Sequence, residues 1–412
     1  SADAQRQAWN LLYADALTDL NYVIKLGTAE AKPNYVAIAT ILKAYNFQVL
    51  TDAYGNVPFS EAGKGDEGIF SPKYDDQKDV YNGIIAMLKD GISQIDLTSA
   101  VHPEADDFIY HGDMHLWLKF ANTTLLKIYL RISQVDPAKA QAGLAELKAT
   151  GAEFIDEGET AKIDYYTAGG NTNPLYASYV ALSTTRNIVA NSTGIKAFTK
   201  LSDDRLSKLY TPAGNSFVGI PSGYLGVPNT GGIATPPTSL SYASAITGAM
   251  PASESATAPV IFIADYESYF LQAEADARGW GVGSGTAEQL YNDGIALSYE
   301  FLGLAADTTT SYANYINHPE IKYSTQTDKL QAIFFQKWYA MCGLQNFEAW
   351  TEGRRTGYIE ANMGLSHLDN KFFTKCITGI SNDLPARMLY PLSEVTRNEK
   401  FPGQKQLGDK VW

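Results

Sequence analysis

Hydrophobic residues recur every three or four positions through the first 150 residues, which is the spacing of helices with one buried side. The pattern predicts helices over residues 3–27, from about 34 to 54, over 77–96 and over 116–132. A fifth helix is predicted from Asp136-Pro137 to Gly151, because aspartate caps helices, proline suits the first helical position and glycine ends helices. We expect these helices to pack as antiparallel pairs.

The same spacing returns after residue 260. It predicts helices over residues 266–277, 291–302, 330–341 and 347–359. Alternation of apolar and polar residues, which marks half-buried strands, is nearly absent throughout the chain. The predicted fold is therefore mostly α. The spacing alone supports an irregular helical array, because the consensus of the common tetratricopeptide repeat is not visible.

Residues 210–259 have a different character. Seven prolines, seven glycines and one charged residue, Glu254, fall among these fifty positions, which no ordinary helix tolerates. The segment also carries four large aromatic residues, too many for a flexible linker: Tyr210, Phe217, Tyr224 and Tyr242. We expect a packed irregular insert that faces a ligand.

The end of the second predicted helix reads LTDAYGNVPFSEA, residues 50–62. Gly55 can adopt the left-handed conformation that ends a helix, and Pro58 restricts the residue before it to an extended backbone. Asp52 and Asn56 can bond to the backbone groups that such an exit leaves without partners, while Tyr54 and Phe59 can pack against the core. The stretch predicts a structural helix exit; a direct ligand role for Asp52 or Tyr54 stays an alternative.

Charge and composition narrow the possible partners. The 412 residues carry a formal charge of −13, from 32 basic and 45 acidic residues, without a long cluster of Lys and Arg. This argues against nucleic acid as a partner. The 26 tyrosines suit surfaces where an aromatic ring meets a polar ligand such as a sugar, although core packing explains most of them.

Two further features concern membranes and cysteines. In the apolar window 116–132, Lys119, Thr123, Lys127 and Arg131 recur every fourth residue, which predicts a buried helix with a polar stripe and not a membrane span. Cys342 and Cys376 belong to no metal or redox motif, so both one disulfide and two buried thiols remain open.

The TDAYGNVPFSEA stretch resembles the SusD/RagB family of outer-membrane nutrient-binding lipoproteins from Bacteroidetes, most closely its shorter SusD-like branch. Seven later stretches match the family in order: WLKFANTTLLKIYLRIS (117–133), NPLY (173–176), LSDDRLSKLYTP (201–212), ESYFLQAEADARGW (267–280), YNDGIALSYE (291–300), EAWTEGRRTGY (348–358) and PARMLYPLSEVTRN (385–398). The resemblance covers nearly the whole chain.

This resemblance implies a mostly α-helical protein in which tetratricopeptide-like helix pairs form the scaffold and long loops form the binding face. It implies polysaccharide utilisation: binding of a glycan at the cell surface and its delivery to a SusC-like TonB-dependent outer-membrane transporter, without catalysis and without a cofactor. It also implies outer-membrane attachment through an N-terminal lipid that would precede the sequence given. We expect one SusD-like domain over residues 1–412, with a helical scaffold in 1–150 and 260–360, a loop-rich ligand-facing insert at about 151–259 and a C-terminal segment over 361–412.

The glycan sites of the family differ among members, so the candidate residues come from chemistry. A sugar ring needs an aromatic ring to stack on and polar side chains to pair with its hydroxyl groups. Tyr74 and Phe70 lie near acids in the loop after the helix exit, and DYYTAGGNTNP combines tyrosines with asparagines. The candidate ligand-binding residues are Phe70, Tyr74, Tyr165, Tyr166, Asn171, Asn173, Tyr224 and Tyr242.

Other interpretations compete with glycan binding. The chain could bind peptides for uptake by the same kind of transporter, it could be a helical glycoside hydrolase with two carboxylates across a cleft, or it could be a protein-interaction scaffold. His111 and His115 have the spacing of metal ligands on a helix but lack an evident third ligand, so no metal site is expected. Arg354-Arg355, which follow Glu352, could clamp an anion, but an internal ion pair with a helix-end carboxylate is favoured.

Overall fold

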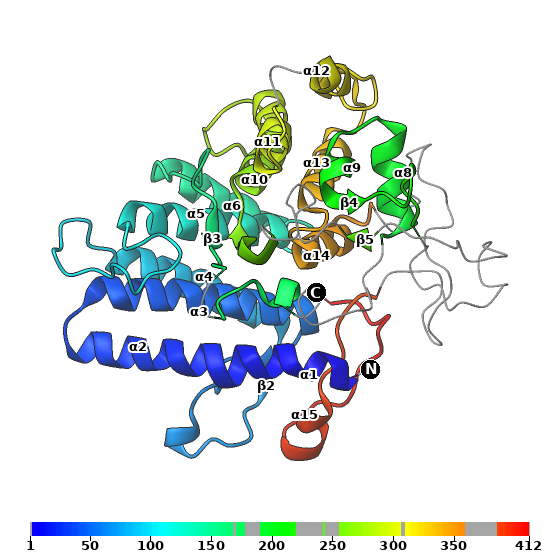
Figure 1. Cartoon of the computed structure of the whole chain (residues 1–412). Coiled ribbons are helices and arrows are strands. Elements are labelled where there is room, and N and C mark those ends of the chain that lie inside the picture. Colours follow the sequence, from blue (N-terminus) through cyan, green and yellow to red (C-terminus); the bar gives the residue numbers. More distant parts are fainter. Residues whose placement is uncertain are drawn as a thin grey trace. The chain divides into compact units, whose positions relative to one another are not determined.

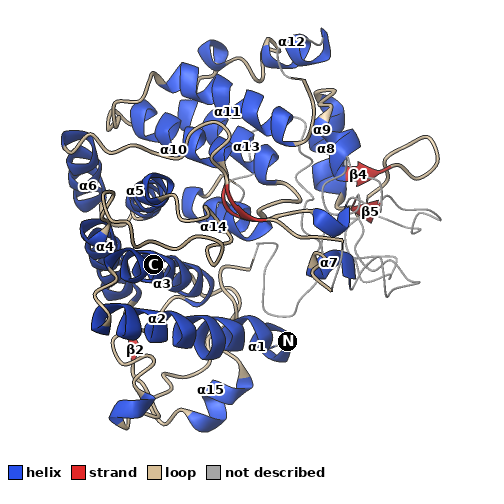
Figure 2. Cartoon of the chain, turned by 60° about the vertical axis from the view of Figure 1, so that its left-hand side comes forward, coloured by secondary structure: helices blue, strands red, loops and turns tan. Residues whose placement is uncertain are grey.

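A computed structural model describes residues 2–167, 170–177, 190–219, 242–243, 255–305, 310–358 and 385–411. The chain divides into two compact units, residues 1–154 with 384–412, and residues 155–383. Each unit is described by itself below. Figure 1 shows the helices of both units along the chain, and Figure 2 shows how few residues belong to strands.

The first unit is built from the helices that the hydrophobic spacing predicts. They are α1 (Ala2–Asn10), a π-helical turn (Leu11–Ala16), α2 (Leu17–Ala29), α3 (Pro33–Tyr54), α4 (Gln77–Gln94), α5 (Met114–Arg131) and α6 (Pro137–Ala149). The predicted N-cap is confirmed, because the Asp136 carboxylate accepts a hydrogen bond from the backbone N–H of Lys139 at 3.2 Å. A short helix, α15 (Leu392–Arg397), was not predicted.

Consecutive helices of the first unit pack against one another, from α2 on α3 to α5 on α6, so the predicted helix pairs are confirmed. Helices α3 and α4 pack closely at Gly91, where an added Cβ would lie 2.7 Å from the Ile41 side chain. Buried Trp117 and Phe120 of α5 complete this core. The predicted buried helix is confirmed in α5, and of its polar stripe Lys127 and Arg131 are buried as well, at 2% and 7% exposure, whereas Lys119 is half-buried. Among the described residues, no helix combines the length and the apolar character needed to cross a membrane.

The helix exit after α3 follows the predicted geometry. Gly55 has φ +78° and ends α3. The next residues, Val57–Pro58, form strand β1, which pairs antiparallel with β2 (Tyr74–Asp75). The Asn56 side chain accepts the backbone N–H of Gln77 at 3.0 Å, so it serves the backbone as expected.

The alternative ligand role for Asp52 or Tyr54 is wrong, because the two side chains are 1% and 0% exposed. The Asp52 carboxylate accepts hydrogen bonds from Gln48 at 2.8 Å and from Tyr81, and it lies 3.5 Å from the Arg131 Nε. Asp52 therefore neutralises the polar stripe of α5 inside the core.

The C-terminal segment 385–411 covers this helix exit. The Met388 N–H donates to the Ala53 carbonyl at 2.7 Å, and the Arg387 guanidinium donates to the Tyr54 carbonyl. These carbonyls belong to the last turn of α3, which has no helical N–H to bond to. The C-terminal segment thus supplies hydrogen-bond donors to the free carbonyls at the end of α3.

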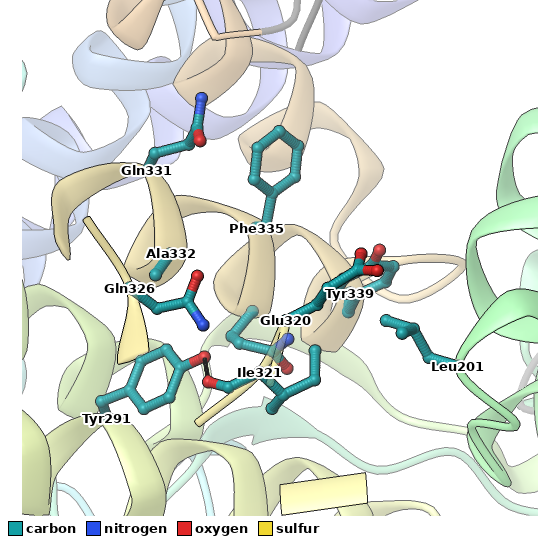
Figure 3. A pocket seen from close by; sticks show the side chains of 10 residues that line it. Leu201, Tyr291, Glu320, Ile321, Gln326, Gln331, Ala332, Phe335 and Tyr339 are labelled. Carbon is teal, nitrogen blue, oxygen red and sulfur yellow. Dashed lines mark hydrogen bonds between the residues drawn. The ribbon is translucent and has the colours of Figure 1, made fainter. Parts of the chain in front are cut away.

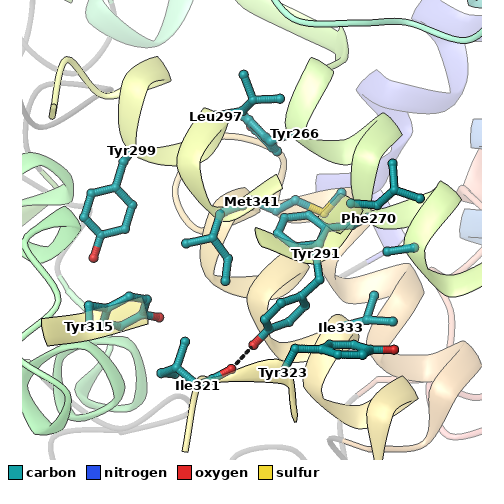
Figure 4. Packing of buried hydrophobic residues seen from close by; sticks show 14 of the residues in the cluster. Tyr266, Phe270, Tyr291, Leu297, Tyr299, Tyr315, Ile321, Tyr323, Ile333 and Met341 are labelled. Carbon is teal, nitrogen blue, oxygen red and sulfur yellow. Dashed lines mark hydrogen bonds between the residues drawn. The ribbon is translucent and has the colours of Figure 1, made fainter. Parts of the chain in front are cut away.

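The second unit contains α7 (Pro174–Tyr176), α8 (Ser192–Lys200), α9 (Arg205–Leu209), α10 (Asp265–Ala277), α11 (Ala287–Phe301), α12 (Thr310–Ile316), α13 (Lys329–Met341) and α14 (Asn346–Thr356). The four helices predicted after residue 260 correspond to α10, α11, α13 and α14. Their shared core is rich in tyrosine; Figure 4 shows Tyr291 beside Tyr323, with ring centroids 5.2 Å apart. The Tyr291 hydroxyl donates to the Ile321 carbonyl at 2.6 Å, so a polar group is satisfied within the core.

Two small antiparallel ladders organise the loop-rich segment of the second unit. Strand β3 (Ala161–Ile163) pairs with β6 (Val260–Ile263), and β4 (Tyr210–Thr211) pairs with β5 (Tyr242–Ala243). The β3–β6 ladder therefore brackets a long stretch of chain that includes the buried helices α8 and α9. The β4–β5 ladder brackets a shorter stretch within it, which we call the inner excursion. Helices do not resume at residue 260, because β6 comes first and α10 begins at Asp265.

Candidate ligand-binding site

The sequence motifs of the second unit are used for structure. Arg355 makes bidentate contact with Glu274, with Nη1 and Nη2 at 2.8 and 2.7 Å from the two carboxylate oxygens. It also bonds to Glu352, whose carboxylate in turn pairs with buried Lys337 at 2.6 Å. The predicted internal ion pair is confirmed for Arg355. Arg354 instead lies over the ring of Trp350, 3.7 Å from its centroid.

Charge compensation governs the protonation of this network. Burial raises the pKa of Glu274, but the Arg355 guanidinium more than offsets that effect, and the net shift is downward. Burial lowers the pKa of Arg355, and the carboxylates of Glu274 and Glu352 raise it above the ordinary value. Glu274 and Arg355 are therefore both charged at neutral pH, and the network joins α10, α13 and α14.

A second buried ion pair anchors the turn between α8 and α9. Arg205 is fully buried and bonds to Asp203 through both Nε and Nη2, the latter at 2.7 Å. Its guanidinium lies 4.8 and 5.4 Å from the ring centroids of Tyr299 and Tyr315. The two tyrosine rings lie over the Arg205 guanidinium as cation–π partners. The Tyr299 hydroxyl also donates a hydrogen bond to the Asp203 carboxylate at 2.9 Å. This anchor fixes the chain just before β4, where the inner excursion begins.

The segment after β3 holds four of the candidate residues, and the structure gives them different roles. Tyr166 is 60% exposed and its backbone N–H donates to the carbonyl of Asn171, which is also exposed, at 2.9 Å. Tyr165 is half-buried. Asn173 is 4% exposed, and its side chain donates to the Ala258 carbonyl at 2.9 Å.

Asn173 therefore acts as a clamp and Tyr166 as an accessible ring. The backbone N–H of Asn173 also donates to the Ala256 carbonyl at 2.8 Å, so two bonds fasten this segment to the residues just before β6. The clamp is close in sequence to Tyr166 and Asn171, which keeps an exposed ring and an exposed carboxamide on a short, supported turn. That combination can stack on one face of a sugar and bond to its hydroxyl groups.

Phe70 and Tyr74 lie on one loop of the first unit but differ in exposure. Phe70 is 83% exposed. Tyr74 is half-buried, and its ring packs against Tyr390 and Phe401 with centroid distances of 5.3 and 6.0 Å. Its hydroxyl donates to Glu394 at 2.8 Å, and burial together with this carboxylate raises the pKa of Tyr74. Tyr74 thus holds the C-terminal segment to the β1–β2 loop.

The remaining two candidates belong to the inner excursion. The backbone of Tyr242 pairs with Thr211 in the β4–β5 ladder, while its side chain and the whole of Tyr224 lie outside the described residues. The structure thus brings Tyr166 together with Asn171 and Asn173 in the second unit, and Phe70 together with Tyr74 in the first.

A small pocket lies elsewhere in the second unit, at residues that the sequence analysis did not select. It measures about 30 Å³, and Tyr291, Glu320, Gln326 and Gln331 are among the residues that line it (Figure 3). Ligand pockets measure roughly 300–1,000 Å³, so this one has room for about one or two waters and not for a sugar ring. The polar segment 318–331, with Glu320 and Gln326 before α13 and Gln331 in its first turn, was the available signal.

Cysteine and histidine provide no further chemistry in the described residues. Cys342 is a free thiol, 3.5 Å from the Tyr210 hydroxyl, and burial raises its pKa. Cys376 lies outside the described residues. Within the ranges that the structure describes, no three His, Cys, Asp or Glu side chains gather as metal ligands would.

Comparison with known families decides the identity of the fold. Residues 1–391 match the profile of the SusD-like family described as starch-binding and associating with the outer membrane. The chain belongs to the SusD-like family. Its family is therefore associated with the outer membrane and with glycan binding, and SusD-like proteins are binding proteins.

Solved structures of other SusD-like proteins have the same fold. A chitin-binding protein is 27% identical, covers 98% of this chain and 87% of its own length, and superposes with a TM-score of 0.78. A chitin-binding SusD homologue from Flavobacterium johnsoniae is 23% identical with a TM-score of 0.77, covering 98% and 85% of the two chains. A SusD-like protein described as Bacteroidetes AC2a is 20% identical with a TM-score of 0.80, covering 100% and 90%. No curated protein matches the sequence.

The motifs shared with the family contribute to the scaffold of the fold. The fold of tetratricopeptide-like helix pairs with long loops, expected from the resemblance, is confirmed. In this SusD-like chain the motif residues Asp52, Arg205, Glu274 and Arg355 stabilise the scaffold, whereas Tyr166 and Asn171 lie in a loop segment between motifs.

Proposed function

We propose that this SusD-like protein binds a nutrient glycan at the cell surface and delivers it, chemically unchanged, to a SusC-like TonB-dependent transporter. The glycan stacks on Tyr166 and bonds to Asn171, and the inner excursion with Tyr224 and Tyr242 extends the binding face. The protein is attached to the outer membrane by an N-terminal lipid.

The observation that carries the proposal is the exposed ring of Tyr166, 60% accessible, next to the exposed Asn171 on a turn that Asn173 fastens. An exposed aromatic ring beside a carboxamide is the pairing that a sugar requires. Family membership supports the same conclusion, and so do the relatives that bind chitin.

Binding and its specificity are tested with the purified chain and a panel of soluble ligands. The panel contains starch-type α-glucans, chitin oligosaccharides, xylan and mixed short peptides, and affinity is measured by calorimetry and by affinity electrophoresis. We expect saturable binding of one glycan class and none of the peptides. Binding of peptides alone would overturn the glycan proposal in favour of a peptide-uptake role.

Delivery without catalysis is tested with the ligand that binds. After a day with the protein, the oligosaccharide is analysed by mass spectrometry, and its length is expected to be unchanged. Shortened products that disappear on substitution of two carboxylates would identify a glycoside hydrolase instead. Growth on that glycan should fail in a strain that lacks the protein and recover when the gene is restored.

A further inference from the structure

The small pocket of the second unit is lined by both polar and apolar side chains. Its walls come from the end of α8, from α11, from the segment 318–326 and from α13, and Figure 3 shows the side chains around it. The polar lining includes Glu320, Gln326 and Gln336, and the apolar lining is formed by Leu201, Ile321, Ala332 and Phe335. Such a mixed lining suits a small group that has both a polar and an apolar part.

Gln336 of α13 offers hydrogen-bond donors to this pocket. Its side chain is 2% exposed, and its carboxamide oxygen accepts a hydrogen bond from the Tyr315 hydroxyl at 3.0 Å and lies 3.4 Å from Arg205 Nη2. Because a guanidinium only donates, these contacts hold the oxygen towards buried Arg205 and leave the Nε2 group on the other side of the carboxamide. None of the described residues accepts a hydrogen bond from that Nε2 group. Since Gln336 lines the pocket, an acceptor on a ligand can satisfy this donor there.

Gln326 offers an acceptor. Its Nε2 group donates to the carbonyls of Pro319 and Lys322, both at 3.0 Å, so the carboxamide is held by the backbone of its own segment. Its oxygen accepts no hydrogen bond from the part of the chain that the structure describes. Gln326 is half-buried, and Figure 3 shows its side chain between Ala332 and Tyr291. The pocket therefore combines a held acceptor with a held donor.

The charge in the lining is already compensated. Of the described residues that line the pocket, only Glu320 is charged, and its carboxylate accepts hydrogen bonds from Lys200 at 2.8 and 3.0 Å. A metal ion or a free anion needs opposite charge around it when it leaves water. The lining therefore favours a neutral occupant.

The size of the pocket restricts the occupant to the end of a side group. Its volume is about 30 Å³, and one water needs roughly 10–15 Å³ of such space, so about two or three heavy atoms fit. Glu320, Gln326 and Ala332 are half-buried, so solvent reaches the lining. A group that enters from a larger ligand must be short and neutral, and it must carry an acceptor, a donor and an apolar end.

We propose that this pocket receives the acetamido group of an N-acetylated sugar, whose ring stays outside. The acetamido carbonyl accepts a hydrogen bond from the Gln336 Nε2 group, the acetamido N–H donates to the Gln326 oxygen, and the methyl group packs against Ala332 and its apolar neighbours. The inference rests on the proposed function and deepens it, because it assigns N-acetylated sugar to the glycan. The pocket shares no residue with the turn that carries Tyr166, so it is a second contact that determines specificity.

The test compares two tetrasaccharides with the same β-linked backbone: chitotetraose, which carries acetamido groups, and cellotetraose, which carries hydroxyl groups in their place. Calorimetry with the full chain gives both affinities for the wild type and for Ala332→Leu, which fills the pocket and keeps Gln336. We expect the wild type to bind chitotetraose at least tenfold more tightly than cellotetraose, and Ala332→Leu to reduce that ratio below threefold. Ala313→Leu, at an exposed position of α12 in the same unit, is the matched control and should keep the wild-type ratio.

A second variant and a small probe address the donor itself. Gln336→Glu keeps an oxygen for Tyr315 and Arg205 but removes both N–H groups, so it should also reduce the ratio below threefold, with folding checked by thermal unfolding. The probe is N-methylacetamide, added to wild-type protein whose glutamine side chains are labelled with nitrogen-15. It should shift the side-chain amide signal of Gln336, which is assigned by its absence from Gln336→Glu, and the shift should be lost in Ala332→Leu.

The outcomes separate this inference from the proposed function. Equal affinity for the two tetrasaccharides, or a ratio that stays at the wild-type value in Ala332→Leu or Gln336→Glu, would overturn the inference and leave glycan binding intact. A Gln336 signal that N-methylacetamide does not shift would show that the pocket holds only water, which also overturns it. Binding of a glycan without acetamido groups, and of neither tetrasaccharide, would refute the N-acetyl assignment alone. A wild type that binds no glycan would overturn the proposed function and this inference together.

Discussion

The hydroxyl of Tyr390 donates a hydrogen bond of 2.7 Å to the backbone carbonyl of Asn56. The same hydroxyl lies 3.2 Å from the Tyr54 carbonyl, and the Tyr390 ring is stacked on the Tyr54 ring with centroids 6.1 Å apart. One side chain near the end of the chain thus satisfies the carbonyls of a helix exit near its beginning. The contact explains why the C-terminal segment belongs to the first unit.

Removal of this hydroxyl should destabilise the protein. Tyr390→Phe leaves the part-buried Asn56 carbonyl without this donor, while the Tyr54 carbonyl keeps its bond from Arg387, and the loss of the one donor costs about 1–3 kcal/mol. The free energy of unfolding is measured by urea denaturation with tryptophan fluorescence, which reports on this site through Trp9, 6.0 Å from the Tyr390 ring. Tyr35→Phe, which removes an exposed bond to Asp106, is the control and should cost less than about 0.5 kcal/mol. Equal effects of the two variants would contradict the account.

Gly55 should tolerate substitution poorly. Its φ of +78° and ψ of −117° are accessible to glycine and strained for other residues, and an added Cβ would lie 3.2 Å from the Val411 side chain. Gly55→Ala should cost about 2–3 kcal/mol. Gly68→Ala is the matched comparison, because Gly68 has φ +81° with nothing near its Cβ position, and it should cost about 1 kcal/mol. A smaller loss at Gly55 than at Gly68, in urea denaturation, would show that the helix exit is not under this constraint.

The buried Arg205 should be required for stability. Arg205→Met leaves the Asp203 carboxylate buried without its cation, which costs about 3–5 kcal/mol. The double variant Asp203→Asn/Arg205→Met removes both charges and should recover part of that loss, as a double-mutant cycle measures. The exposed pair of Lys162 and Asp164 has the same sequence spacing, and Lys162→Met should change stability by less than about 1 kcal/mol. A double variant no more stable than Arg205→Met alone would contradict the pairing argument.

The pH dependence of stability should include a contribution from Glu274. Its pKa in the folded chain is lowered, so the stabilisation it contributes is complete above its ordinary pKa of 4.5 and is lost as the pH falls through the folded value. Glu274→Gln should therefore destabilise the protein by about 2–4 kcal/mol at pH 7, and the difference from wild type should shrink below pH 4.5. Glu67→Gln, at an exposed site, is the control and should change stability little at either pH. A gap between wild type and Glu274→Gln that stays constant from pH 7 to pH 3.5 would refute this assignment.

The hydrophobic spacing predicted the long helices because each buries one side in a local core. The same spacing could not predict the β3–β6 ladder, since Ala161 and Ile263 pair across a hundred residues of chain and each strand is too short for visible alternation. Short α8 and α9 were missed for the same reason. Their position depends on Arg205, a residue type that is almost never fully buried without a partner.

The candidate ligand residues show the same limit. Phe70 and Tyr74 lie four residues apart in one loop, and only the structure shows that Tyr74 is packed by Tyr390 and Phe401 from the other end of the chain. Asn171 and Asn173 are two residues apart, and the bond of Asn173 to Ala258 decides which of them is accessible. The sequence selects candidates by residue type, but long-range partners determine which of their side chains are buried.

The most direct test of the account is the glycan affinity of Tyr166→Ala, measured by isothermal titration calorimetry with the oligosaccharide that the wild type binds. Loss of a stacking ring worth about 1 kcal/mol or more predicts at least a fivefold weaker Kd. Phe108→Ala, which removes an equally exposed ring elsewhere, should leave Kd within twofold of the wild type. A Tyr166→Ala variant that binds the oligosaccharide as tightly as Phe108→Ala does would contradict the claim that the turn with Tyr166 and Asn171 binds the ligand.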